Sequence, residues 1–329
     1  MFIRYEKKDG SAVLTRLFGD NPVVNVPSVI DGLPVVGLGE YCFSARELHD
    51  QTTDVNCDTD ELEKAICQGE VRALSGDYIT EVVLPDTVNS IGDLCFYGCR
   101  ELRSVTLYAS SADLRQGSDD TGRRSDKQSV PATESGYSHD ISIGSDVFIN
   151  CRNLAWIILC LGVKEKTAIR RILMQRNSAT YVRFEDAAAY FPEFSEHYDL
   201  VGPAHIFELA IDGHGLRARQ CFENGFFIPE AYDSMFEQAA VSEDEKTLCR
   251  MAASRLQFPK QLSESARRMY EAYLGEHDET FFEDAVSGRD LKLVLSLKKQ
   301  GVLTSEQIKK CLILTTGSRW VEGTRMLLA

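Results

Sequence analysis

Residues Pro85–Leu107 read PDTVNSIGDLCFYGCRELRSVTL, and this stretch decides the fold because nearly the same pattern returns downstream. Every matched pair of positions is separated by 52 residues, since 143 − 91 = 52. The matched positions are Ile91-Gly92, Phe96, Cys99, Leu102, Val105 and Leu107, and then Ile143-Gly144, Phe148, Cys151, Leu154, Ile157 and Leu159. Repetition of this kind indicates a solenoid, in which each unit buries its apolar face by stacking on its neighbours.

An earlier copy lies nearer the N-terminus. Val24–Pro27, Leu38-Gly39 and Phe43 match Val82–Pro85, Ile91-Gly92 and Phe96 in order. The sequence therefore predicts three stacked units. In each unit two matched apolar residues stand two positions apart near the end, as in Val105-Thr106-Leu107, which is the spacing of a strand with both side chains on one face.

Each unit also carries a glycine after a buried aliphatic residue. Gly92 and Gly144 hold this position, and we expect a sharp turn with positive φ there, since glycine adopts that conformation most easily. Phe96 and Phe148 follow, and they are predicted to enter the core from the side opposite the strand.

These offsets resemble the BspA-like class of bacterial leucine-rich repeats, whose unit reads roughly L-x-x-V-x-L-P-x-x-V-x-x-I-G-x-x-x-F-x-x-C. The resemblance covers residues 1 to about 160 and implies a short β-solenoid there. Two insertions, at about 45–78 and 109–139, interrupt units that are otherwise contiguous in this class. Residues 109–139 are rich in Ser, Asp, Gly and Arg and are predicted to be disordered. In the first insertion, Thr59 begins a predicted capped helix.

After Gly162 the periodicity changes from strand-like to helical. Ile169, Ile172 and Leu173 share one face of a predicted helix within the basic run Lys164–Arg176. Further on, the segment that begins at Ile206 resembles the segment that begins 75 residues later, at Phe281. We therefore predict an α+β protein with a leucine-rich-repeat domain at 1–160 and an all-α, ankyrin-like helical-repeat domain at 161–329.

The charge is acidic and unevenly distributed. The formal net charge is −14 at pH 7, and residues 1–160 account for −11 of it, with 14 Lys and Arg against 25 Asp and Glu. This charge argues against nucleic acid or an anionic membrane as the partner. The start of the chain lacks the apolar region of a secretory signal, and no run approaches the roughly 18 apolar residues of a membrane helix. We therefore expect a cytoplasmic protein with reduced cysteines.

Candidate catalytic groups are few. His197, His205 and His214, with Glu193 and Glu196, form the one cluster that suggests a metal, and a metal-dependent enzyme is the alternative function. The nine-residue step between His205 and His214 is not a known ligand spacing, so no metal or cofactor is predicted.

Two further features have simple structural interpretations. Cys95 and Cys99 could form a redox or metal pair, but the repeat pattern makes Cys99 a core filler. The basic run Lys164–Arg176 could contact an acidic partner or nucleic acid, although a solvated helix face, or a match to the acidic repeat half, is the more ordinary interpretation. No nucleophile elbow, phosphate-binding loop or H-E-x-x-H motif occurs, so the sequence favours a non-enzymatic protein.

A binding surface follows from the strand register. If Val105 and Leu107 face inward, Thr106 faces outward, with Arg103 just before it. The predicted protein-binding residues are Glu81, Val83, Arg103, Thr106, Trp156 and Ile158. Such a surface suits another protein as partner. The alternative is that helices after Gly162 cover it. The oligomeric state is left open.

Overall fold

The computed structural model describes residues 1–46, 54–55, 59–109, 141–201 and 206–328. The chain forms two compact units. The first contains residues 1–160 and 166–176, and the second contains 161–165 and 177–329. The segment 166–176, predicted to belong with the C-terminal part, therefore packs with the first unit.

The first unit begins with a β-hairpin. Strands β1 (Phe2–Lys8) and β2 (Ser11–Gly19) pair antiparallel up to Lys8 and Ser11. Asp9 and Gly10 both have positive φ, 49° and 75°, as a two-residue turn that follows the twist of the strands requires.

The hairpin belongs to a sheet in which the repeats stack. β5 (Leu33–Leu38) runs parallel to β2, followed by β9 (Ser90–Ile91) and β11 (Ser142–Ile143). Leu38 lies beside Ile91, and Ile91 beside Ile143, so the three predicted units occupy successive rungs. Three short strands flank this sheet: β4 (Val29–Ile30), β6 (Asp54–Val55) and β7 (Arg72–Ala73).

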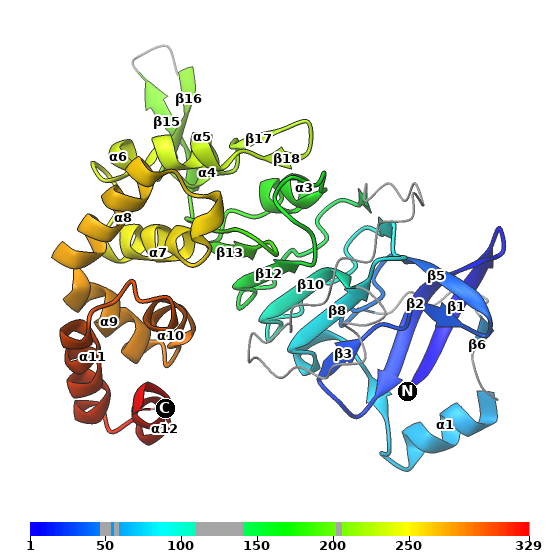
Figure 1. Ribbon diagram of the computed structural model, residues 1–329. Helices are drawn as coiled ribbons and strands as arrows, with labels where there is room; N and C mark the ends of the chain where they lie inside the picture. The colour runs from blue at the N-terminus through cyan, green and yellow to red at the C-terminus, as the bar shows by residue number, and fades with distance from the viewer. Residues whose placement is uncertain (47–53, 56–58, 110–140, 202–205, 329) are drawn as a thin grey trace, which may run out of the picture. The chain divides into compact units, whose positions relative to one another are not determined.

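A second set of parallel strands carries the alternating part of each unit. Its members are β3 (Val23–Asn25), β8 (Glu81–Pro85), β10 (Ser104–Ala109) and β12 (Trp156–Leu159). Val82 lies beside Val24 on one side and Val105 on the other, and Val105 lies beside Ile157. Figure 1 shows these strands side by side. Residues that match between units in the sequence are therefore neighbours on adjacent strands.

Phenylalanines form the centre of the stack. The rings of Phe43 and Phe96 lie 4.9 Å apart at 8°, and those of Phe96 and Phe148 lie 4.9 Å apart at 15°. All three side chains are buried. The predicted core position of Phe96 and Phe148 is confirmed.

The prediction that Gly92 and Gly144 adopt positive φ is wrong. Positive φ occurs two residues after each repeat glycine, at Tyr41 (55°), Leu94 (53°) and Asp146 (52°), and not at Gly92 or Gly144. A Cβ on Gly92 would instead lie 2.6 Å from the Glu40 nitrogen. These glycines are required because the backbones of adjacent rungs approach closely.

The first insertion contains the predicted helix, α1 (Thr59–Cys67), and a 3-10 turn, η1 (Gly76–Tyr78). The disorder predicted for residues 109–139 falls almost wholly outside the described residues. The segment 166–176 contains helix α3 (Ile169–Met174), whose Ile169, Ile172 and Leu173 are buried as predicted.

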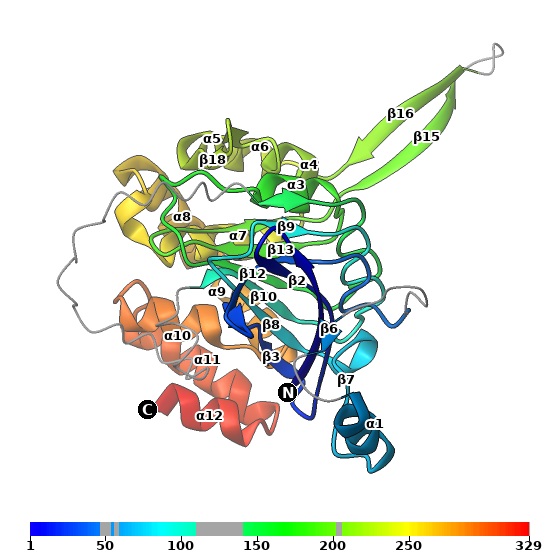
Figure 2. The same cartoon turned by 90° about the vertical axis from the view of Figure 1, so that its right-hand side faces the viewer.

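The second unit is not all-α, and the prediction for residues 161–329 is wrong in this respect. Three antiparallel hairpins precede its main helices: β13 (Thr180–Arg183) with β14 (Ala188–Phe191), β15 (Ser195–Val201) with β16 (Ile206–Asp212), and β17 (Phe222–Glu223) with β18 (Phe226–Phe227). Figure 2 shows β15 and β16 extending away from the rest of this unit.

The error at β16 has a simple cause. Leu209 and Ile211 alternate with Ala210 and Asp212, which is a strand period, and β15 supplies the antiparallel partner. The matched segment 75 residues later begins instead within α9 (Asp278–Ser287), so the two segments share composition but not structure.

The rest of the second unit is helical. Its remaining helices are α4 (Gly215–Ala218), α5 (Pro229–Ser234), α6 (Phe236–Ala239), α7 (Glu245–Leu256), η2 (Pro259–Gln261), α8 (Glu264–Glu276), α10 (Lys292–Lys299), α11 (Ser305–Gly317) and α12 (Val321–Leu328). Asp244, Ser263 and Thr304 cap α7, α8 and α11 with side-chain oxygens. The helical prediction is right for this part, and an ankyrin-like arrangement stays a prediction.

Among the described helices, none has both the length and the apolar character needed to cross a membrane.

Candidate protein-binding face

Strands β8, β10 and β12 have two different faces. Val82, Val105 and Ile157 are buried in the core of the first unit, whereas their neighbours along each strand are only partly buried. The partly buried side chains form two rows across the strands: Glu81, Ser104 and Trp156 in one, and Val83, Thr106 and Ile158 in the other. We call the surface formed by these two rows and Arg103 the repeat face.

Arg103 lies in the turn immediately before β10. Its amide nitrogen donates to the Thr80 carbonyl at 2.7 Å, and its carbonyl accepts from Trp156 N at 3.1 Å. The backbone of Arg103 thus joins three successive rungs, while its side chain is exposed. The structure brings all six residues predicted for protein binding together on the repeat face.

The rows continue onto the first repeat, which the prediction omitted. Val23 lies beside Glu81, and Asn25 beside Val83. The match of Val24–Pro27 to Val82–Pro85 contained this information, because it fixes the register of the first rung.

The chemistry of the repeat face suits binding to a protein surface. Val83, Trp156 and Ile158 supply apolar surface, with Arg103 and Glu81 as charges of opposite sign. Aromatic and arginine side chains are enriched among the residues that dominate binding energy in protein interfaces.

The histidine cluster is dispersed over separate contacts. His197 Nδ1 lies 3.3 Å from an Asp212 carboxylate oxygen across the β15–β16 hairpin. His214 Nδ1 lies 2.9 Å from the Ser242 hydroxyl, and its amide nitrogen donates to Glu243. His205 falls outside the described residues. Within the described ranges, no three His, Cys, Asp or Glu side chains are grouped so that they could hold a metal ion.

The cysteines pair between rungs and not along the sequence. Burial is the largest cause that raises the pKa of the Cys95 thiol, and the neighbouring Cys42 thiol raises it further. The neighbouring Cys151 thiol raises the pKa of Cys99, and Cys99 lowers that of Cys151. The Cys99 and Cys151 thiols also donate to the carbonyls of Phe43 and Phe96, at 3.1 and 3.0 Å. Both are buried, as core fillers are.

The basic run contains one side chain with a role that sequence reasoning missed. Arg170 and Arg171 are exposed, as expected of a solvated helix face. Arg176 is buried, and its guanidinium donates to the carbonyl oxygens of Cys151 at 3.3 Å and Leu154 at 2.9 Å. A signal was present, because Arg176 follows Leu173 by three residues and so falls on the buried side of the helical turn.

Comparison with known proteins identifies one region. Residues 70–118 match the family described as BspA type Leucine rich repeat region (6 copies). No curated protein matches the chain, and no solved structure matches it. The matched region contains β8 and β10, with Glu81, Val83, Arg103 and Thr106. Leucine-rich repeats of the BspA type therefore form the part of this chain that carries most of the repeat face.

Proposed function

We propose that this protein is a non-enzymatic scaffold for protein–protein interaction and that the repeat face binds its partner. The observation that carries the proposal is the alignment of Val83, Trp156 and Ile158 on one side of the parallel strands, next to Arg103 and Glu81. Leucine-rich repeats generally mediate protein–protein interactions, and the family match at residues 70–118 supports their presence.

The chemistry of the face indicates what the partner presents. An apolar side chain on the partner would lie against Trp156 and Ile158, and an acidic group would pair with Arg103. The net charge of −14 disfavours nucleic acid, whose phosphates would be repelled.

Trp156→Ala tests the proposal. Binding partners are first isolated from the native host with the wild-type protein and identified, and their affinity is then measured with purified components. We expect Trp156→Ala to unfold at the same temperature as the wild type and to weaken binding by about tenfold or more, which corresponds to about 1.4 kcal/mol.

Arg152→Ala is the matched control for Arg103→Ala, because Arg152 is also exposed and in a turn but is not one of the residues of the repeat face. Arg103→Ala should weaken binding and Arg152→Ala should not. The competing hypothesis is that the helices after Gly162 cover the face. It predicts that Trp156→Ala destabilises the protein and that Trp156 resists iodide quenching, measured in a Trp320→Phe background that leaves one tryptophan.

A further inference from the structure

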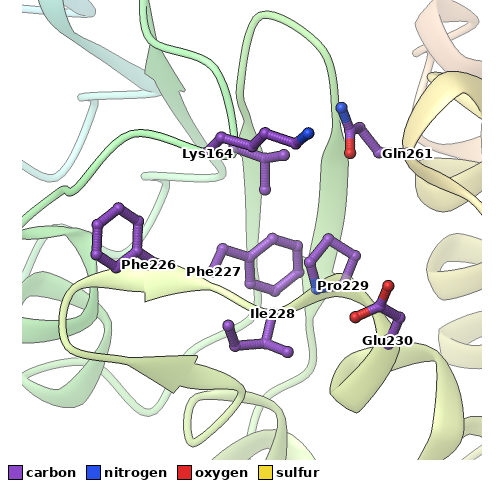
Figure 3. A pocket seen from close by; sticks show the side chains of 8 residues that line it. Lys164, Phe226, Phe227, Ile228, Pro229, Glu230 and Gln261 are labelled. Atoms are coloured by element: carbon purple, nitrogen blue, oxygen red, sulfur yellow. The ribbon is translucent and has the colours of Figure 1, made fainter.

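A pocket of about 330 Å³ lies wholly within the second unit, apart from the repeat face. Its volume is at the low end of the range for small-molecule sites, roughly 300–1,000 Å³. The wall residues come from three places in the chain: the connection at Val163 and Lys164, the segment Phe226–Glu230, and Gln261. Figure 3 shows these side chains around the pocket.

The floor of the pocket is apolar and well supported. Phe227 is buried, and its ring stacks on Phe184 at 5.4 Å and 10°. Tyr232 packs edge-on against Phe227 at 5.9 Å. Ile228 and Pro229 continue the apolar surface. Because aromatic side chains fix the floor from below, it is available to an apolar group without rearrangement.

Two walls of the pocket are held by one carboxylate. Asp186 accepts from Val163 N at 2.7 Å with one oxygen and from Gln261 Nε2 at 3.1 Å with the other. The Gln261 carbonyl accepts in turn from Arg255 at 3.0 Å. Arg255 is itself buried and bonded through two nitrogens to Asp233, at 2.7 and 3.0 Å. The pocket is therefore pre-formed by a partly buried polar network that reaches the buried Arg255.

The pocket carries one positive and one negative side chain, Lys164 and Glu230, and both are exposed. Within the described part of the chain, neither has an ion pair or a side-chain hydrogen bond. In Figure 3, Glu230 and Gln261 lie on the same side of the pocket, Lys164 points toward that side, and Phe226 lies at the opposite end. The polar recognition groups are thus separated from part of the apolar surface.

We propose that this pocket binds a free α-amino acid with an apolar side chain. The ammonium of Lys164 pairs with the carboxylate of the ligand, and the Glu230 carboxylate pairs with its amino group. The apolar side chain lies over Phe227 and Ile228. A phosphate or other simple anion fits poorly, because Glu230 would repel it.

The first experiment uses the unmodified full-length protein and four probes. All four probes carry the same apolar side chain and differ in charge. Phenylalanine has both the ammonium and the carboxylate, N-acetylphenylalanine has only the carboxylate, and phenylalaninamide has only the ammonium. N-acetylphenylalaninamide has neither. Binding is measured by saturation-transfer NMR and calorimetry. We expect phenylalanine to bind with a Kd on the order of 1 mM and the loss of either charge to weaken binding by about tenfold.

Two variants assign the charges to residues. The Lys164→Met variant should bind phenylalanine and phenylalaninamide equally, because it lacks the Lys164 ammonium that would pair with the carboxylate of phenylalanine. In Glu230→Gln, phenylalanine and N-acetylphenylalanine should bind equally. Lys299→Met and Glu237→Gln alter exposed residues outside the pocket and should keep the wild-type order of the four probes.

The proposal is overturned by any of three results. These are no saturable binding of phenylalanine, equal binding of all four probes by the wild type, and an unchanged order of the probes in both pocket variants. The comparison of probes on the wild type does not depend on any variant, so a folding defect in one variant leaves the test intact.

Discussion

At the scale of single residues, the first unit depends on side chains that hold the same place in successive repeats. Phe96 is the middle ring of the phenylalanine stack, with Phe43 and Phe148 each 4.9 Å away. Phe96→Ala should therefore reduce the free energy of unfolding by about 3–5 kcal/mol, measured by chemical denaturation. Phe148→Ala should cost less, because Phe148 stacks on one neighbouring repeat ring and not on two. A loss below about 1 kcal/mol for Phe96→Ala would contradict the inward register.

The repeat glycines give a second prediction, which separates crowding from backbone conformation. Gly92→Ala should be strongly destabilising, because its Cβ would lie 2.6 Å from the Glu40 nitrogen and 2.7 Å from a Gly39 backbone carbon. Gly98 is the control, since it has positive φ (74°) but no atom within 4 Å of the position that a Cβ would take. Gly98→Ala should cost about 1 kcal/mol, and Gly92→Ala clearly more, in thermal or urea unfolding. Equal effects would show that crowding is unimportant.

At the scale of elements, the segment Lys166–Arg176 completes the last repeat. The Gln175 amide nitrogen Nε2 donates to the Gly144 carbonyl at 2.6 Å, and its Oε1 accepts from Val147 N at 3.1 Å. Arg176 reaches the carbonyls of Cys151 and Leu154. In earlier repeats the next rung satisfies such backbone groups, as when Leu94 N donates to the Ser145 carbonyl. The segment therefore caps the open end of this part of the stack.

Arg176→Met tests the cap. The substitution keeps an apolar stem but removes the Arg176 donor from the Leu154 carbonyl and one of two donors from the Cys151 carbonyl, which also accepts from Leu154 N. We therefore expect a loss of about 2 kcal/mol in the free energy of unfolding. Arg171→Met, on the exposed side of α3, should change it by less than about 0.5 kcal/mol. If the two variants unfold alike, Arg176 does not stabilise the end of the stack.

At the scale of the whole molecule, the chain divides into a repeat unit and a unit of hairpins and helices. The division gives a direct test of the corrected fold. A fragment of residues 177–329 should give a circular dichroism spectrum with both strand and helix contributions, because β13–β18 lie within it. Infrared spectroscopy in the amide I region provides an independent measure of strand. A spectrum of helix with no strand would contradict the assignment of these hairpins.

The sequence by itself determined the repeats, their register and the residues of the repeat face. These follow from local spacing. A fixed offset places equivalent residues on neighbouring rungs, and strand alternation places Thr106 and Val105 on opposite faces of the sheet. The same offsets are sufficient to align Glu81, Ser104 and Trp156 in one row. The aromatic stack follows from them as well.

Tertiary structure alone decided the proximity of Cys99 to Cys151, the burial of Arg176, the crowding at Gly92 and the pocket around Lys164 and Glu230. Each depends on atoms distant in the sequence, which no local pattern records. The hairpins of the second unit belong with these, because short apolar runs fit strand and helix equally well until a partner is available. At β16 that partner is β15, and its backbone hydrogen bonds select the strand.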